Sequence, residues 1–292
     1  MSSVKYDNNY KPNLDLLPDP QVSCNIEGAS VPIPKVGINE LEWPIRFLSK
    51  SGMSKTLKAN ISAYVSLGQG SKGINMSRLI RVAQPFLDSE LSLYAMKSIL
   101  KEYKEKVGAE ESYIKFKFDY PIRQKALRSD LTGWQYYSCA TEGRMDVDGN
   151  FNLYLTVEYT YSSACPCSNE LSEHARKERG IPAIPHSQRS SAVVTVKIDI
   201  DNVLYIEDLV EHLNNALHTE VQVMVKRADE QAFAELNAAY PKFVEDATRL
   251  IYSELDKDKK ILDFNVICNH FESLHKHNAC AVIFKGIEGG LR

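Results

Sequence analysis

The sequence predicts an α+β protein in which antiparallel sheets carry helices on one face. Runs with an apolar residue at every second position alternate with runs of helical periodicity, and the order strand, helix, helix, strands occurs twice. The first copy starts near residue 57 and the second near residue 192. We therefore favour a duplicated unit over a single α+β domain with unrelated halves. Oligomerisation is one way to cover the edges of such sheets.

The first copy opens with a strand at 57–65, where the odd-numbered apolar side chains share one face. Asp88-Ser-Glu-Leu91 is expected to start a helix that counts Tyr94 among its apolar positions and ends near Gly108. Residues 113–120 alternate again, and this alternation predicts a second strand.

A long hairpin is predicted at 135–161, because two β-rich runs flank Asp148-Gly149, a dipeptide that suits a tight turn with positive φ. The segment 169–185 that follows reads as a loop. The second copy then supplies the remaining predicted elements, which are a strand at 192–200, a helix at 206–217, a longer helix from Pro241, and strands at 264–270 and 279–284.

Residues 1–50 hold six of the twelve prolines. Proline fixes φ and lacks a backbone donor, so this stretch is expected to be an extended arm without regular structure. We divide the chain into that arm at 1–50, a first unit at 51–134, a hairpin and candidate active-site loop at 135–190, and a second unit at 191–292.

The composition excludes several classes of protein. With 35 Lys and Arg against 38 Asp and Glu the net charge is −3, which gives no global electrostatic reason to bind nucleic acid or an anionic membrane. No run approaches the roughly 20 apolar residues of a membrane helix, and no secretion signal is visible at the N-terminus. We therefore expect a cytoplasmic protein, without nucleic-acid or membrane partners, whose six cysteines are reduced.

Three short segments could carry chemistry. Two thiols, Cys165 and Cys167, follow a predicted strand, although both could simply be small buried residues. His186 precedes the next strand, and residues 268–277 hold three histidines and one acid on alternating faces, so not all of them can be ligands. A thiolate with histidines and a carboxylate suits a catalytic metal that keeps an open position.

No phosphate-binding glycine motif follows a strand, so a nucleotide would have to be held by side chains and helix termini. The motifs S-A-C-P-C-S, P-H-S-Q-R-S, V-K-R-A-D-E-Q, P-K-F-V-E-D and H-F-E-S-L-H-K-H occur in this order after K-G-I-N-M-S-R-L. Over roughly residues 18–288 this ordered set resembles GTP cyclohydrolase of type IB. The resemblance implies a tunnelling fold, with two tandem ββααββ units per chain, and a homotetramer with sites at subunit interfaces.

The resemblance also implies roles for particular residues. Cys165 matches the catalytic, metal-binding cysteine of the family, and His186, Glu230 and His275 match its other metal-site residues, with His186 also a catalytic candidate. Glu245 matches the acid that anchors the purine. The cofactor would be a divalent ion, Mn²⁺, Zn²⁺ or Fe²⁺.

The implied reaction hydrolyses GTP at guanine C8, releases formate and forms 7,8-dihydroneopterin triphosphate, the first step of tetrahydrofolate and pterin or queuosine-type biosynthesis. Arg189 is one of several basic residues that could neutralise the triphosphate; the others are Lys72, Arg78, Lys226 and Arg227. Two alternatives stay open. One is an NADPH-dependent nitrile reductase of queuosine synthesis, which uses a cysteine nucleophile without metal, and the other is a non-catalytic metal- or pterin-binding module.

Overall fold

The computed structural model describes residues 7–13, 16–17 and 26–292. The described residues of the first half form five strands and two helices, which are β1 (Ile33–Leu48), β2 (Ser54–Leu67), α1 (Met76–Leu87), β3 (Glu90–Leu91), α2 (Leu93–Val107), β4 (Ser112–Lys125) and β5 (Thr132–Met145). The second half adds four strands and four helices, which are β6 (Phe151–Ala164), α3 (Pro166–Arg179), β7 (Ser187–Ile198), α4 (Ile206–Leu217), α5 (Arg227–Ala239), α6 (Val244–Leu255), β8 (Ile261–His270) and β9 (Ala279–Phe284).

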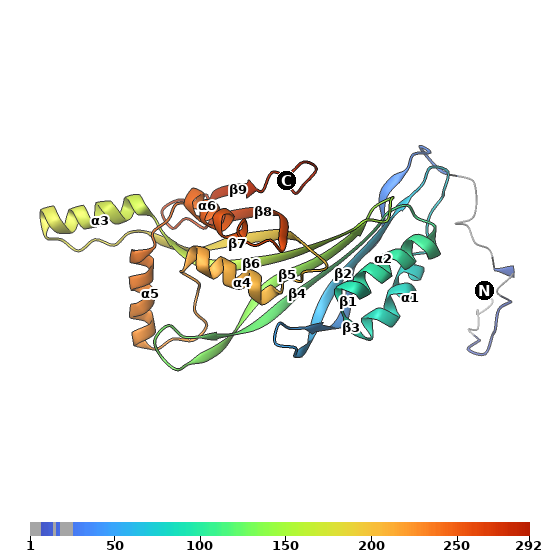
Figure 1. Cartoon of the computed structure of the whole chain (residues 1–292), viewed down its shortest axis with the longest axis horizontal. Helices are drawn as coiled ribbons and strands as arrows, with labels where there is room; N and C mark the ends of the chain where they lie inside the picture. The colour runs from blue at the N-terminus through green and yellow to red at the C-terminus, as the bar shows by residue number, and fades with distance from the viewer. Residues whose placement is uncertain (1–6, 14–15, 18–25) are drawn as a thin grey trace, which may run out of the picture.

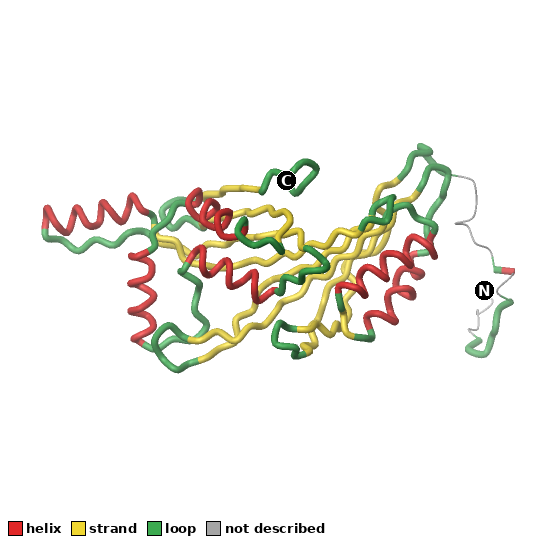
Figure 2. The backbone as a smooth tube through the Cα atoms, viewed as in Figure 1, coloured by secondary structure: helices red, strands yellow, loops and turns green. Residues whose placement is uncertain are grey.

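All the strands join one sheet in the order β3-β1-β2-β4-β5-β6-β7-β8-β9. Its pairs are antiparallel except for the short parallel pairing of β1 with β3. Figure 1 shows α1 and α2 over one end of this sheet and α4 and α6 over the other, on the same face. The predicted α+β class, with duplicated units and helices on one face, is confirmed, and the two units share one continuous twisted sheet (Figure 2).

The alternation of apolar residues decides which face the helices cover. In β2 the side chains of Leu57, Ala59, Ile61, Ala63 and Val65 are all less than a tenth exposed, as the period of two predicts. The intervening side chains point to the other, polar face. The helices therefore pack on the apolar face, where the core lies.

The predicted hairpin is confirmed as β5 and β6, and it joins the two halves of the sheet. Its two strands pair from Met145 and Phe151, beside the turn, to Cys139 and Val157. Gly149 adopts a positive φ of 84° in the turn, a conformation that glycine reaches without the steric cost of a Cβ atom. The hairpin thus makes one sheet of two similar units.

The N-terminal expectation needs correction, because residues 33–48 of the supposed irregular arm form strand β1. Pro44 is tolerated there, since β3 pairs with β1 only at Arg46 and Phe47 and leaves the outer side of β1 unpaired at the proline. Cys24 and prolines 18 and 20 lie outside the described residues. The division at 50, 134 and 190 stays a prediction.

Helix starts were predicted less well than strands. The helix expected from Asp88 begins at Leu93, after β3, with the Ser92 hydroxyl accepting a hydrogen bond from the backbone N–H of Ala95 at 3.0 Å. Tyr94 then falls on the outer face and is 63% exposed. The left-handed C-cap at Gly108 is confirmed.

In the second half, the helix expected from Pro241 begins three residues later, as α6. Helix α5 was not anticipated, and most of the supposed loop at 169–185 is helix α3. Helix α3 is strongly polar along its length, so its sequence lacks the apolar periodicity that predicts a helix. Among the helices that the structure describes, none combines the length and apolar character that a membrane crossing requires.

Candidate active site

Strand pairing brings Cys165 and His186 together although α3 separates them in the sequence. Ala164, the last residue of β6, lies opposite Ser187, the first residue of β7. One step further along, the backbone N–H of Cys165 donates to the carbonyl oxygen of His186 at 3.1 Å. Cys165 is the N-cap of α3, and Pro166 occupies the first turn, where its missing N–H costs nothing. The segment 166–185, which contains α3, therefore leaves the sheet directly after Cys165 and returns to it at His186.

A cavity of about 380 Å³ opens at this point. Cys165, His186 and His275 all line it, from the end of β6, the start of β7 and the loop between β8 and β9. These three predicted residues thus share one cavity. The cavity wall also includes Cys167, Glu272 and His277. These three belonged to segments already singled out in the sequence, but the sequence could not show which members face the cavity.

The ring of His186 is held by two acceptors. Its Nδ1 atom lies 3.2 Å from Oε1 of Gln188 and 3.5 Å from Oε2 of Glu272. The amide of Gln188 is oriented in turn, because its Nε2 donates to Ser163 Oγ at 2.8 Å. Two acceptors at Nδ1 fix the imidazole proton there. The lone pair of Nε2 is then available to a metal ion or a proton.

Of the three histidines in residues 268–277, His270 points away from the cavity. It is 2% exposed and points into the core, where its Nε2 lies 3.0 Å from the hydroxyl of Tyr161. Burial, together with the nearby Lys242 charge, lowers the pKa of His270 to about 4. His270 is therefore a neutral core imidazole bonded to Tyr161, and it does not line the cavity.

Lys242 is a buried cation close to the same strand end. Its backbone N–H donates to the carbonyl oxygen of Ala164 at 3.1 Å, and its Nζ donates to the carbonyl oxygen of Tyr240 at 2.6 Å and to Thr219 Oγ1 at 3.2 Å. Burial lowers the pKa of Lys242 to about 8. The lysine ties the segment before α6 to the end of β6, immediately before Cys165.

The other predicted residues do not reach this cavity within one chain. Glu230 lies on the first turns of α5, Glu245 on the first turn of α6, and Arg189 on β7, and all three are exposed. The neighbour of Glu230, Asp229, is buried and accepts hydrogen bonds from the backbone N–H groups of Arg128 and Ser129. This contact fixes α5 against the loop between β4 and β5.

Comparison with known proteins identifies the family. The sequence pattern described as type I GTP cyclohydrolase folE2 matches residues 17–281. The GTP cyclohydrolase FolE2 of Dinoroseobacter shibae is 46% identical over 276 residues, which span 93% of this chain and 75% of the relative. The chain belongs to the type I GTP cyclohydrolase family. A second relative, FolE2 of Paracoccus denitrificans, is 44% identical over 285 residues, 98% of this chain and 88% of its own length.

The protein is thus a GTP cyclohydrolase I of folate and pterin biosynthesis, and the nitrile-reductase and non-catalytic alternatives are not favoured. Solved structures agree on the fold. Uricase from Arthrobacter globiformis superimposes with a TM-score of 0.54 over 92% of this chain and 97% of its own, at 8% identity. Urate oxidase from Bacillus subtilis gives a TM-score of 0.53 over 86% of this chain and 97% of its own, at 5% identity. The cyclohydrolase therefore has the tunnelling fold.

Membership of the family indicates a metal-dependent enzyme. The donors around the cavity fit such an ion in kind, since a thiolate, imidazoles and a carboxylate are ligands of Zn²⁺ and related metals. Within residues 7–13, 16–17 and 26–292, however, no three Cys, His, Asp or Glu side chains are close enough to hold an ion by themselves. One chain supplies suitable donors without assembling a complete set.

Proposed function

We propose that the cavity lined by Cys165, His186 and His275 is the site at which GTP is opened at guanine C8. In this reaction water adds to C8, N7 receives a proton, formate leaves, and the remaining atoms form 7,8-dihydroneopterin triphosphate. The convergence of three family-motif residues from three separate segments on one cavity carries this proposal.

Cys165, His186, His275 and Glu230 are the residues proposed to hold the metal, and Mn²⁺, Zn²⁺ and Fe²⁺ are the candidate ions. A divalent ion bound there would lower the pKa of water to about 7, so that hydroxide is available at neutral pH. The cavity sits beside the N-terminus of α3, whose free N–H groups favour negative charge.

His186 is proposed to act through Nε2, because Gln188 and Glu272 occupy Nδ1. This atom can bind the ion or carry a proton to N7. The variant His186→Ala separates the two roles. Loss of bound metal identifies a ligand, whereas full metal content with reduced turnover identifies a proton carrier.

Glu245 is proposed to recognise guanine, and Arg189 to bind the triphosphate. A carboxylate can accept from the N1–H and the 2-amino group of guanine together, a pair of donors that adenine lacks. Glu245→Gln should weaken GTP binding by roughly 10–1000-fold and leave the metal content unchanged. Unchanged GTP affinity in this variant would mean that the guanine pocket lies elsewhere.

We further propose a homotetramer in which residues of neighbouring subunits complete each site. Glu230 and Glu245 are exposed in the single chain, and the edge strand β9 presents Val282 and Phe284 to solvent. An unpaired, partly apolar edge favours pairing with another chain. A monomeric mass by light scattering at micromolar concentration would contradict this assembly.

Mixed tetramers test the shared site directly. Cys165→Ala and Glu230→Ala should each abolish formate release, but subunits that are co-expressed should regain up to about a quarter of wild-type activity, because one interface in four then combines both native residues. No recovery in confirmed mixed tetramers would place Cys165 and Glu230 in the same subunit's site.

The activity itself is tested with purified protein, GTP and each candidate ion, with and without a chelator. Formate and the oxidised, fluorescent pterin should appear in equal amounts, and chelation should stop both. Intact GTP binding without formate under any ion would overturn the assignment of the cavity.

A further inference from the structure

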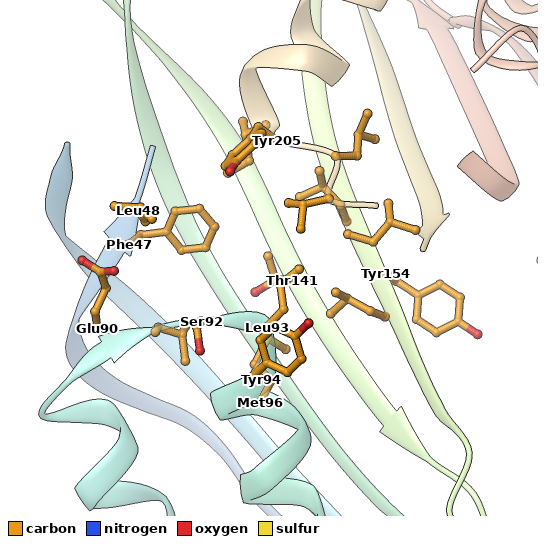
Figure 3. Close-up of a pocket in the computed structure, with 17 residues that line it drawn as sticks. Phe47, Leu48, Glu90, Ser92, Leu93, Tyr94, Met96, Thr141, Tyr154 and Tyr205 are labelled. Carbon is orange, nitrogen blue, oxygen red and sulfur yellow. The ribbon is translucent and has the colours of Figure 1, made fainter. Parts of the chain in front are cut away.

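A second cavity lies on the helix-covered face, where the two halves of the molecule meet. Its volume is about 190 Å³. Phe47 and Met96 line it from the first half (Figure 3). Leu155 and Leu204 line it from the second half. Most of this lining is apolar, and the first turns of α2 and α4 border it. We call it the seam cavity.

A buried polar atom without a hydrogen-bond partner borders the seam cavity. Thr141 of β5 lines it, is 3% exposed, and has no hydrogen-bond partner for its Oγ1 atom. In the described part of the chain only one other buried side-chain oxygen lacks a partner, that of Gln222. Thr141 faces the helix-covered side of the sheet, towards Leu93 and Tyr94 of α2 (Figure 3). Leu155 is its cross-strand neighbour. Because leaving a buried hydroxyl unpaired costs free energy, a partner at this position would be stabilising.

The charges around the seam cavity restrict what can bind. No Lys, Arg or His occurs among the described residues that line it, whereas Glu90 places a carboxylate at its rim. A phosphate or carboxylate ligand would therefore lack a counter-charge and would be repelled. GTP is excluded on this ground, so the seam cavity is not a second copy of the active site.

The size of the cavity sets the size of the ligand. An apolar cavity of about 150 Å³ stays dry and accepts benzene, and the seam cavity is slightly larger. We propose that it binds a small neutral molecule with a single aromatic ring or a branched aliphatic body and one hydrogen-bonding group directed at Thr141. Such a molecule would contact both halves of the chain at once and so stabilise their contact.

Two matched probes test the proposal on the full-length, metal-loaded enzyme. Benzyl alcohol carries the hydroxyl group that the proposal requires, and toluene lacks it. Calorimetric titration should give saturable binding of benzyl alcohol with a Kd below about 1 mM, and the melting temperature should rise as the site fills. Absence of saturable binding, or toluene binding as tightly as benzyl alcohol, would overturn the proposal.

Thr141→Val keeps the shape of the side chain and removes its hydroxyl. This variant should bind benzyl alcohol about 2- to 10-fold more weakly, the range expected for one neutral hydrogen bond, and toluene at least as well as the wild type. Thr156→Val is the matched control, since Thr156 bonds to Thr195 outside this cavity. Equal effects of Thr141→Val on both probes would refute the role of the hydroxyl.

Two filling variants locate the binding. Leu93 of the first half and Val203 of the second half both line the cavity and are half-buried, so Leu93→Trp and Val203→Phe should fill it without disturbing the fully buried core. Each folded variant should lose benzyl alcohol binding and retain formate release at saturating GTP. Undiminished binding in both would show that the probe sits elsewhere, and would overturn the assignment while leaving the proposed active site untouched.

Discussion

The half of the chain from β1 to β5 and the half from β6 to β9 follow the same plan, in which four antiparallel strands carry two helices on one face. They differ in what has been added to it. In the first half the one addition to this plan among the described residues is the two-residue β3. The second half adds α3 between its first two strands and α5 between its two covering helices. Both additions project beyond the sheet at the same end of the molecule (Figure 1).

The halves also differ in what they bury. Among the described residues the first half buries three polar side chains, Ser49, Ser112 and Thr141. The second half buries thirteen, which are Ser162, Ser163, Ser172, Gln188, Ser190, Ser191, Thr219, Asp229, Lys242, Thr248, Asp263, Asn265 and His270. Because most buried polar groups need hydrogen-bond partners, the second half is the one in which more polar side chains are fixed in place, and it is also the half that contains the proposed site.

The comparison indicates how a duplicated scaffold acquires a function. The first unit keeps an apolar core and supplies sheet and stability. The second unit interrupts a strand pair with α3, so that Cys165 and His186 stand at a strand end where bonded neighbours can orient them. Substitutions in the second half should therefore affect turnover, and matched substitutions in the first half should affect only stability.

The largest effect is expected at Cys165. Cys165→Ala should lower metal content and reduce formate release by at least about 100-fold, since loss of even an outer-shell partner of a ligand costs 10- to 100-fold. The matched change Cys139→Ala removes a buried thiol from the first half and should spare turnover. Full metal content and activity in Cys165→Ala would contradict the view that the second half carries the chemistry.

A smaller effect is expected at Glu272, which positions His186. Glu272→Ala should reduce metal affinity or turnover by about 10- to 100-fold, and Glu272→Gln, which keeps an acceptor for Nδ1, should lose less. Glu142→Gln is the control in the first half, where the carboxylate pairs with Arg144 and Lys115. Identical losses in the Ala and Gln variants would argue against a hydrogen-bonding role.

Lowering the pH below 7 should destabilise the second half more than the first, because all seven histidines follow residue 170. The folded-state pKa of His270 is about 4, below its ordinary value of 6.5, so the unfolded chain takes up the proton first and stability falls as the pH drops from 6.5 towards 4. Tyr161 and Lys242 face this ring and offer no negative charge.

Between pH 7 and 4.5 the wild type should accordingly lose about 2 kcal/mol more stability than His270→Phe. Urea unfolding at the two pH values measures the difference. Parallel losses in the two proteins would show that the buried histidine does not cause the acid sensitivity.

The smallest effect is expected in the turn that joins the halves. Gly149→Ala should cost about 1 kcal/mol, because φ is 84° and no neighbouring atom obstructs a Cβ, so that backbone strain is the only penalty. Gly68→Ala, in open space without a positive φ, should be nearly neutral. Turnover should be unchanged in both variants, and a difference in turnover would mean that the hairpin couples the halves to the chemistry.

Local patterns predicted the strands well. The alternation in β2, the turn at Gly149 and the C-cap at Gly108 depend on neighbouring residues alone, and all three are as expected. Helices α3 and α5 were not predicted, because both are largely exposed and lack the apolar stripe by which a helix is recognised in a sequence. Strand β1 was not predicted, because its prolines suggested an irregular arm. Pro44 is acceptable there only because the outer edge of β1 is unpaired at that residue.

By itself the sequence determined the class of fold, the duplication and, through the order of its motifs, the family, since periodicity and motif order are properties of the chain alone. It also named Cys165, His186 and His275. Only the tertiary structure decided that these residues share a cavity and that His270 turns into the core. It also decided that Glu230 and Glu245 remain outside. The physical reason is that strand register and helix packing join residues far apart in sequence, and no spacing along the chain records which side chains will meet.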